Sequence, residues 1–367
     1  ASFMALDASL EESIGSSSAE DVQYNQLLDY SNEFNYAVEP SYTYFEAEIA
    51  IEDSADFLKQ LSNLILYPKW GQASLEKVAV KLKERIAAEL KEPSYRFELA
   101  ALTQLGMPEG KASLPPVDSL QQVTLAQAEK AFSALLQNPN QLVLIISGNF
   151  EPDVLRKEIE ESFGRFQPKD VSFEENTIQP LTLPLPNVKE VSYKPYKENM
   201  IRLSLPLPYL LSESNFNQTE LLKEALEISL REEADALFSE NSSIDASLEL
   251  PFYPSGQNAW IVIQLLSNSN HVGKDAEKLL ALVRKRLKNG VEEAFVDKAK
   301  EQLKAADDFW KLQEEFWISF YANSYLMKFN PEEMILSRRM MHQISSKEIT
   351  ERLQTFPENH YTLLIAR

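Results

Sequence analysis

Two short stretches far apart in the chain share one pattern, Val123–Gln127 (VTLAQ) and Ile344–Glu348 (ISSKE). In each stretch an apolar residue precedes a Thr or Ser, and a Gln or Glu follows three positions after that hydroxyl residue. This spacing is typical of a capping box, in which the side chains and the backbone at a helix start exchange hydrogen bonds. Each stretch therefore predicts the start of a helix, and the two starts lie 221 positions apart (344 minus 123).

Nearly the same offset relates two long amphipathic segments that precede the capping boxes. Leu75 and Ala79 in the first segment correspond to Phe295 and Ala299 in the second, each 220 positions later. Each half of the chain presents a strand, a helix, a long helix, a capped helix and a strand, in that order. We therefore infer an internal duplication of one fold.

Hydrophobic periodicity predicts the individual elements of both halves. Helices are expected at 3–14, 19–28, 53–66, 72–91, 94–105, 124–137, 151–163, 217–238, 272–287, 292–325 and 345–356. Strands are expected at 42–51, 142–146, 200–205, 244–250, 259–266 and 360–366. Strands and helices do not alternate strictly, which favours the α+β class. The prediction is two homologous domains, each a mainly antiparallel sheet with helices packed on one face.

A proline-rich stretch separates the two halves. Proline fixes the backbone and removes an N–H donor, so it disfavours both helix and sheet and is typical of extended linkers. We predict a first domain at 1–167, a linker at 168–195 and a second domain at 196–367. The prolines of the linker are Pro168, Pro180, Pro184, Pro186 and Pro195.

Composition excludes several classes of function. The 367 residues include 36 Lys and Arg against 56 Asp and Glu, a net charge of −20, and no cysteine. That charge disfavours nucleic acids and anionic membrane surfaces as partners. The absence of cysteine excludes disulfides, thiolate nucleophiles and cysteine zinc sites. No purely apolar run is longer than that of Leu142–Ile146, which is too short to span a membrane.

The small numbers of histidines and glycines exclude further kinds of functional site. None of His271, His342 and His360 has another histidine within five residues, so a helical zinc motif with two histidines is absent. Nine glycines, widely spaced, give no phosphate-binding loop and no dinucleotide fingerprint. We therefore predict no catalytic residue and no metal ligand in this chain. Two similar domains would instead enclose a cavity, where an extended peptide could add to a sheet edge.

Three segments resemble the insulinase/pitrilysin superfamily of zinc peptidases. They are Leu142–Gly164, which begins LVLIISGNFEPD and ends in Phe-Gly, Leu230–Phe238 (LREEADALF), and Gly290–Trp317. The resemblance covers nearly the whole chain. Family members carry a His-x-x-Glu-His zinc motif in one domain only, and this chain has no histidine before His271. It therefore resembles the zinc-free C-terminal half of such a peptidase, close to the periplasmic long forms.

The resemblance also implies which residues contact substrate. In the family an Arg and a Tyr of a zinc-free domain reach the bound peptide, and Arg231 and Phe238 stand at those positions here. Phe238 lacks the tyrosine hydroxyl, which removes a donor that could polarise the scissile carbonyl. Another interpretation makes Arg231 a surface arginine paired with Glu227 or Asp235, and Phe238 an ordinary core residue.

Three hypotheses follow. In the first, the chain is the non-catalytic half of a zinc metallopeptidase and forms the wall of a peptide-binding chamber. A zinc-bearing N-terminal half or a homologous subunit is then its partner and supplies the zinc, and the chain alone is inactive. In the second, it is a zinc-free scaffold or assembly subunit. In the third, suggested by the charge of −20, it is a duplicated α+β module for a cationic ligand. The resemblance favours the periplasm or another exported location, while the composition also suits the cytoplasm.

Overall fold

The computed structural model describes most of the chain and divides it into two compact units. The described residues are 4, 31–38, 42–68, 71–107, 120, 122–167, 186–192, 196–238, 242–251, 253, 255 and 258–367. One unit combines Ala1–Ala88 with Leu114–Asn176, and the other combines Glu89–Ser113 with Thr177–Arg367. A segment of the first half of the sequence thus belongs to the second unit.

In its described residues, the first unit contains an antiparallel strand pair and four α-helices. Its elements are β1 (Ser31–Val38), β2 (Thr43–Ile49), α3 (Ser54–Leu66), α4 (Gln72–Glu89), α8 (Leu125–Leu136) and α9 (Pro152–Phe163). Phe34 of β1 stacks on Phe45 of β2 at 6.0 Å between ring centroids, and meets Phe57 of α3 edge-on at 6.3 Å. The helical spacing of α4 buries one apolar stripe in this core, namely Leu75, Val78, Leu82 and Ile86.

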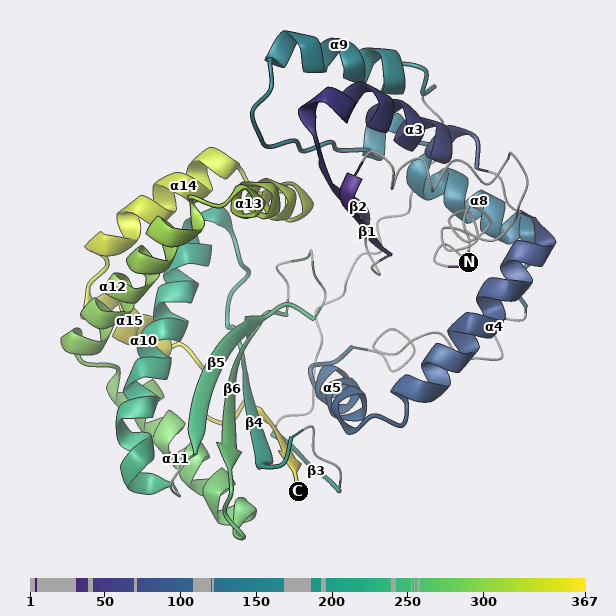
Figure 1. Ribbon diagram of the computed structural model, residues 1–367. Helices are drawn as coiled ribbons and strands as arrows, with labels where there is room; N and C mark the ends of the chain where they lie inside the picture. Colours follow the sequence, from purple (N-terminus) through teal and green to yellow (C-terminus); the bar gives the residue numbers. More distant parts are fainter. Residues whose placement is uncertain are drawn as a thin grey trace. The chain divides into compact units, whose positions relative to one another are not determined.

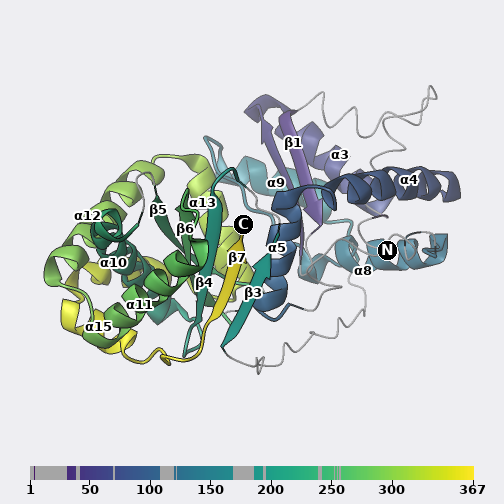
Figure 2. The same ribbon diagram turned by 90° about the horizontal axis from the view of Figure 1, so that it is seen from below.

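The second unit contains a five-stranded sheet of order β3-β7-β4-β6-β5 (Figures 1 and 2). Its strands are β3 (Asn187–Val191), β4 (Asn199–Pro206), β5 (Ser243–Glu249), β6 (Trp260–Ser267) and β7 (Thr362–Ala366). Only β3 and β7 run parallel, while the other neighbours are antiparallel. The predicted α+β class with a mainly antiparallel sheet is confirmed.

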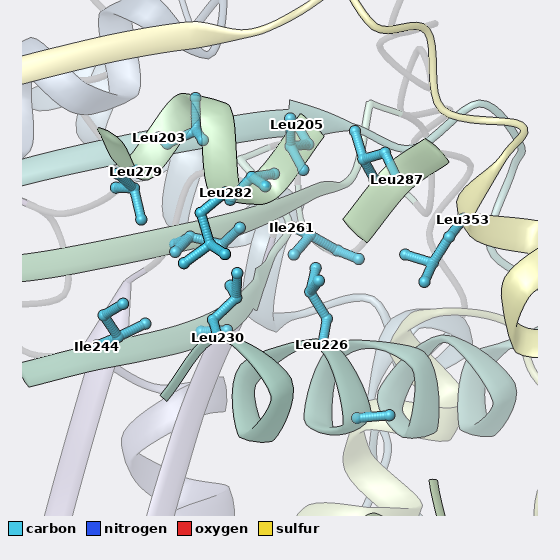
Figure 3. Close-up of a cluster of buried hydrophobic side chains, with 14 of the residues drawn as sticks. Leu203, Leu205, Leu226, Leu230, Ile244, Ile261, Leu279, Leu282, Leu287 and Leu353 are labelled. Atoms are coloured by element: carbon cyan, nitrogen blue, oxygen red, sulfur yellow. The ribbon is translucent and has the colours of Figure 1, made fainter. Parts of the chain in front are cut away.

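Helices cover one face of this sheet. They are α10 (Glu213–Leu237), α11 (Val272–Asn289), α12 (Glu293–Trp310) and α15 (Ser346–Leu353). Two further helices, α13 (Glu314–Leu326) and α14 (Pro331–Met340), lie between α12 and α15 in the sequence. Figure 3 shows Leu226 and Leu230 of α10 directed at Ile261 and Ile244 on the strands. Gly290 ends α11 with a φ of +78°, a conformation that favours glycine.

A helix from the first half of the sequence covers the opposite face. In Figures 1 and 2, α5 (Pro93–Gln104) lies across the sheet from α10 and α11. Phe97 is fully buried there and packs in one apolar cluster with Met200 and Leu364. Gln104 donates from Nε2 to the carbonyl oxygen of Leu363 at 3.3 Å. Helices were expected on one face only, and α5 adds a cover on the second face.

Two pairs of helices keep the spacing that the capping boxes indicate. α8 and α15 both open with the expected capping boxes, in which Thr124 and Ser345 accept backbone hydrogen bonds from Gln127 and Glu348. α4 and α12 each contain 18 residues, and their first residues, 72 and 293, keep the offset of 221 (293 minus 72). These two pairs of helices therefore share one spacing, while the duplication itself stays a prediction.

Two predicted elements are wrong. Residues 142–146 form no strand, and Val143 and Leu144 are 44% and 45% exposed, because no strand pairs with this segment in the described part of the chain. The helix predicted at 292–325 is two helices, α12 and α13. No proline or glycine marks the break, where the Trp317 indole donates to the carbonyl of Lys311 at 3.0 Å.

Among the described strands and α-helices, three were not predicted, namely β1, β3 and α14. β3 lies inside the stretch predicted as a linker and pairs with the C-terminal strand β7. Most of that stretch, the helix predicted at 19–28 and all but Met4 of the helix predicted at 3–14 fall outside the described residues. The domain boundaries at 167 and 196 stay a prediction. Among the helices that the structure describes, none is both long enough and apolar enough to cross a membrane.

Candidate functional site

Arg231 lies on α10, where its guanidinium reaches across to the strand β5. Its Nε donates to the carbonyl oxygen of Ile244 at 2.7 Å, and its Nη2 pairs with Glu227 at 2.6 Å and with Asp245 at 3.5 Å. The side chain is 54% exposed. The helix places Glu227 one turn before Arg231, an orientation that favours the i,i+4 ion pair.

Glu227 connects Arg231 to the backbone of β5. One carboxylate oxygen binds Arg231, and the other accepts the N–H of Ala246 at 2.9 Å. The side chain is only 7% exposed. Burial raises the pKa of the Glu227 carboxyl, although the Ala246 N–H and the Arg231 guanidinium favour the charged form. Glu227 is thus a buried anion that holds both a cation and a strand.

This environment predicts a pH dependence of stability. A carboxyl whose pKa is raised on folding contributes stability below its ordinary pKa of 4.5 and loses that contribution as the pH rises through the folded value. We expect the wild type to lose unfolding free energy relative to Glu227→Gln as the pH rises from 4.5 towards 7. Urea unfolding at several pH values measures this difference, and a difference that grows in the opposite direction would contradict it.

The arrangement leaves one part of Arg231 available to a ligand. Nε and Nη2 are engaged, whereas no partner of Nη1 lies among the residues that the structure describes. A guanidinium N–H can donate to the carbonyl oxygen of a peptide. Glu227 and Asp245 place two carboxylates around this single cation, so a neutral carbonyl fits better than an anionic group.

Phe238, the second residue predicted to contact substrate, lies in the hydrophobic core. It follows the last residue of α10, is 8% exposed, and has the ammonium of Lys278 at 6.0 Å from its ring centroid. A ring buried in this way has little surface to offer to a ligand. The structure therefore places Arg231 at an accessible position and Phe238 within the packing of the second unit.

No metal centre is apparent in the part of the chain that the structure describes. His271, His342 and His360 are all exposed, and they belong to different segments. No group of three His, Cys, Asp or Glu side chains among the described residues could hold a metal ion. The three histidines are thus not brought together.

A second charged cluster was not predicted. Arg202 of β4 is 3% exposed, and its guanidinium binds Glu249 of β5 and approaches Glu98 of α5 at 3.5 Å. Burial raises the pKa of the Glu249 carboxyl. The sequence offered one signal for this cluster, a single arginine inside the apolar strand predicted at 200–205. This cluster joins α5 to the sheet.

Comparison with known proteins identifies the kind of domain that holds this site. Residues 122–303, just under half of the chain, match the family model of the peptidase M16 inactive domain. Residues 122–303 thus resemble an M16 inactive domain. The predicted resemblance to the zinc-free half of the insulinase/pitrilysin family is thereby confirmed. No curated protein matches the chain.

Solved structures with the same fold include several M16 proteins. An M16-like peptidase from Alicyclobacillus acidocaldarius superposes with a TM-score of 0.76 at 14% identity, over 99% of this chain and 85% of that one. An M16 inactive domain from Pseudomonas fluorescens gives 0.73 at 13% identity, over 99% and 86%. The periplasmic protease PqqL from Escherichia coli gives 0.74 at 13% identity, over 98% of this chain but 40% of its own length. At these identities the likeness establishes the fold.

Proposed function

We propose that this chain is the non-catalytic half of an M16 zinc peptidase and lines the peptide-binding chamber opposite a zinc-bearing half. The observation that carries the proposal is the match of residues 122–303 to the inactive domain of this family. The chain corresponds to 40% of the length of PqqL, as expected for one half of a longer protease. In this proposal the partner half supplies the zinc, and the periplasm, where PqqL is found, is the expected location.

In this proposal Arg231 is the residue that contacts substrate. It is exposed, it is held in place by Glu227 and Ile244, and its Nη1 can donate to a peptide carbonyl. Phe238 is at most an indirect contributor, because its ring is buried. The chain alone is expected to bind peptides without cleaving them.

Peptide binding by the isolated chain and by Arg231→Ala tests the proposal. A fluorescently labelled mixture of unstructured peptides is titrated with each protein, and binding is followed by anisotropy. Loss of one charge-assisted hydrogen bond, about 1.5–3 kcal/mol, should weaken the affinity at least roughly tenfold. The matched control is Arg339→Ala, which removes an exposed arginine of α14 and should leave the affinity unchanged.

Three results would contradict the proposal. Absence of peptide binding by the wild type would contradict a role in lining a peptide-binding chamber. Equal weakening by both arginine variants would show that the affinity for peptides depends only on the net charge of the protein. Cleavage of the peptides by the chain alone, abolished by a chelator, would also contradict a non-catalytic half.

A zinc-free scaffold subunit is the second candidate function. The observation that favours it is Phe238, which has no hydroxyl and is buried where the family has a tyrosine. A scaffold needs no peptide contact, so it predicts no peptide binding and no effect of Arg231→Ala in the same titration.

A further inference from the structure

The strand β5 forms one edge of the sheet of the second unit. Among the residues that the structure describes, its one neighbour in the sheet is β6, with Ile244 opposite Leu265 and Ala246 opposite Ile263. The backbone groups on the other side of an edge strand can pair with any extended chain, so an uncovered edge favours aggregation and strand addition. The contacts of these outward groups decide whether this edge is open.

Two outward groups of β5 are bound by side chains of α10. The carbonyl oxygen of Ile244 accepts the Nε–H of Arg231 at 2.7 Å, and the N–H of Ala246 donates to Glu227 at 2.9 Å. The same two side chains pair with each other at 2.6 Å. Since these groups point at α10, they point away from β6.

The positions of this donor and this acceptor correspond to one residue of a parallel strand. In a parallel pair, a residue facing position i donates its N–H to the carbonyl of i−1 and accepts from the N–H of i+1. With Asp245 as position i, Arg231 supplies that donor and Glu227 supplies that acceptor. We propose that the Glu227–Arg231 pair replaces one residue of a neighbouring strand and thereby closes the β5 edge to strand addition.

The chain that is excluded, in this proposal, is a second copy of the same protein. Two identical β5 edges could pair antiparallel about a twofold axis, which is the commonest symmetry of protein dimers. The Arg231 guanidinium occupies the place where an incoming strand would put an N–H donor, and the Glu227 carboxylate occupies the place where it would put a carbonyl acceptor. The inference does not depend on the proposed peptidase role, because closure uses Nε and Nη2 of Arg231 rather than Nη1.

The test is the self-association of a double variant, Glu227→Ala with Arg231→Ala. Its weight-average mass, measured by sedimentation over a range of concentrations, is expected to rise towards about twice that of the wild type. The matched control is Glu233→Ala with Arg286→Ala. That pair also joins an α10 carboxylate to a poorly exposed arginine at 2.5 Å and contacts a backbone carbonyl, that of Ser229, but it touches no sheet edge. The control should keep the wild-type mass.

Hydrogen exchange of the Ala246 amide supplies a second measurement that needs only a single variant. In the wild type this N–H should exchange slowly because it is bonded to Glu227. Glu227→Ala should accelerate it roughly tenfold or more, the factor expected for one lost hydrogen bond. Glu227→Gln, which keeps an acceptor oxygen, should retain most of the protection. A folded double variant with the mass of the wild type, or unchanged exchange at Ala246 in Glu227→Ala, would overturn the proposal.

Discussion

Arg202→Ala is expected to lower the free energy of unfolding of the second unit by about 3–5 kcal/mol, the usual cost of removing one partner from a buried ion pair. The guanidinium is 3% exposed and is the cation bound by Glu249 and approached by Glu98. Without it, two carboxylates from α5 and β5 face each other across a vacated, poorly solvated space. Glu249, whose pKa burial already raises, loses the charge that stabilises its ionised form.

Urea unfolding followed by tryptophan fluorescence measures this effect, because three of the four tryptophans, at 260, 310 and 317, belong to the second unit. Arg156→Ala is the control, since its ion pair with Asp153 is exposed and should contribute less than about 1 kcal/mol. Arg202→Met combined with Glu249→Gln should recover much of the loss, because neither buried charge remains. A change of less than about 1 kcal/mol in Arg202→Ala would show that the cluster does not join α5 to the sheet.

Phe97→Ala is expected to destabilise the same unit by about 3–5 kcal/mol, the range for removing a buried phenylalanine ring. The ring is completely buried between α5 and the strands, against Met200 and Leu364. Its removal leaves a cavity that the helix and the sheet can close only in part. The loss should appear in the second unit, although Phe97 comes from the first half of the sequence.

The same unfolding measurement applies, with Phe309→Ala as the control. Phe309 is 57% exposed at the end of α12, so its truncation should change the free energy of unfolding by less than about 0.5 kcal/mol. If Phe97→Ala left the second-unit transition unchanged, the assignment of Glu89–Ser113 to that unit would be contradicted. Phe97→Leu, which keeps part of the side-chain volume, should lower the free energy of unfolding by less than Phe97→Ala does if the contact is well packed.

The elements that were predicted correctly depend on local signals. The capping boxes at Thr124 and Ser345 bond within one helical turn, so sequence spacing suffices to place the starts of α8 and α15. The amphipathic stripe of α4 and the alternation in β2 are equally local patterns. Residues 142–146 show the limit of this approach: a short apolar run is compatible with a buried strand, but a strand also needs a neighbour to pair with.

For the candidate site too, local spacing predicted one part, and the packing of distant segments decided the rest. The four-residue spacing of Glu227 and Arg231 indicates an ion pair on one face of a helix, and this pair was among the interpretations of the sequence. Their bonds to Ile244 and Ala246 could not be predicted, because these residues are brought beside α10 by the packing of β5 on the sheet. The burial of Phe238 is likewise a result of core packing.

The sequence by itself determined the order of the helices, their repeated spacing, the excess of negative charge and the absence of a paired-histidine zinc motif, since these follow from residue type and separation along the chain. Only the tertiary structure decided that α5 belongs to the second unit, that Arg202 is buried, and that Glu227 and Arg231 bind the backbone of β5. These features depend on contacts between residues far apart in the sequence, such as Gln104 and Leu363, which no local pattern encodes.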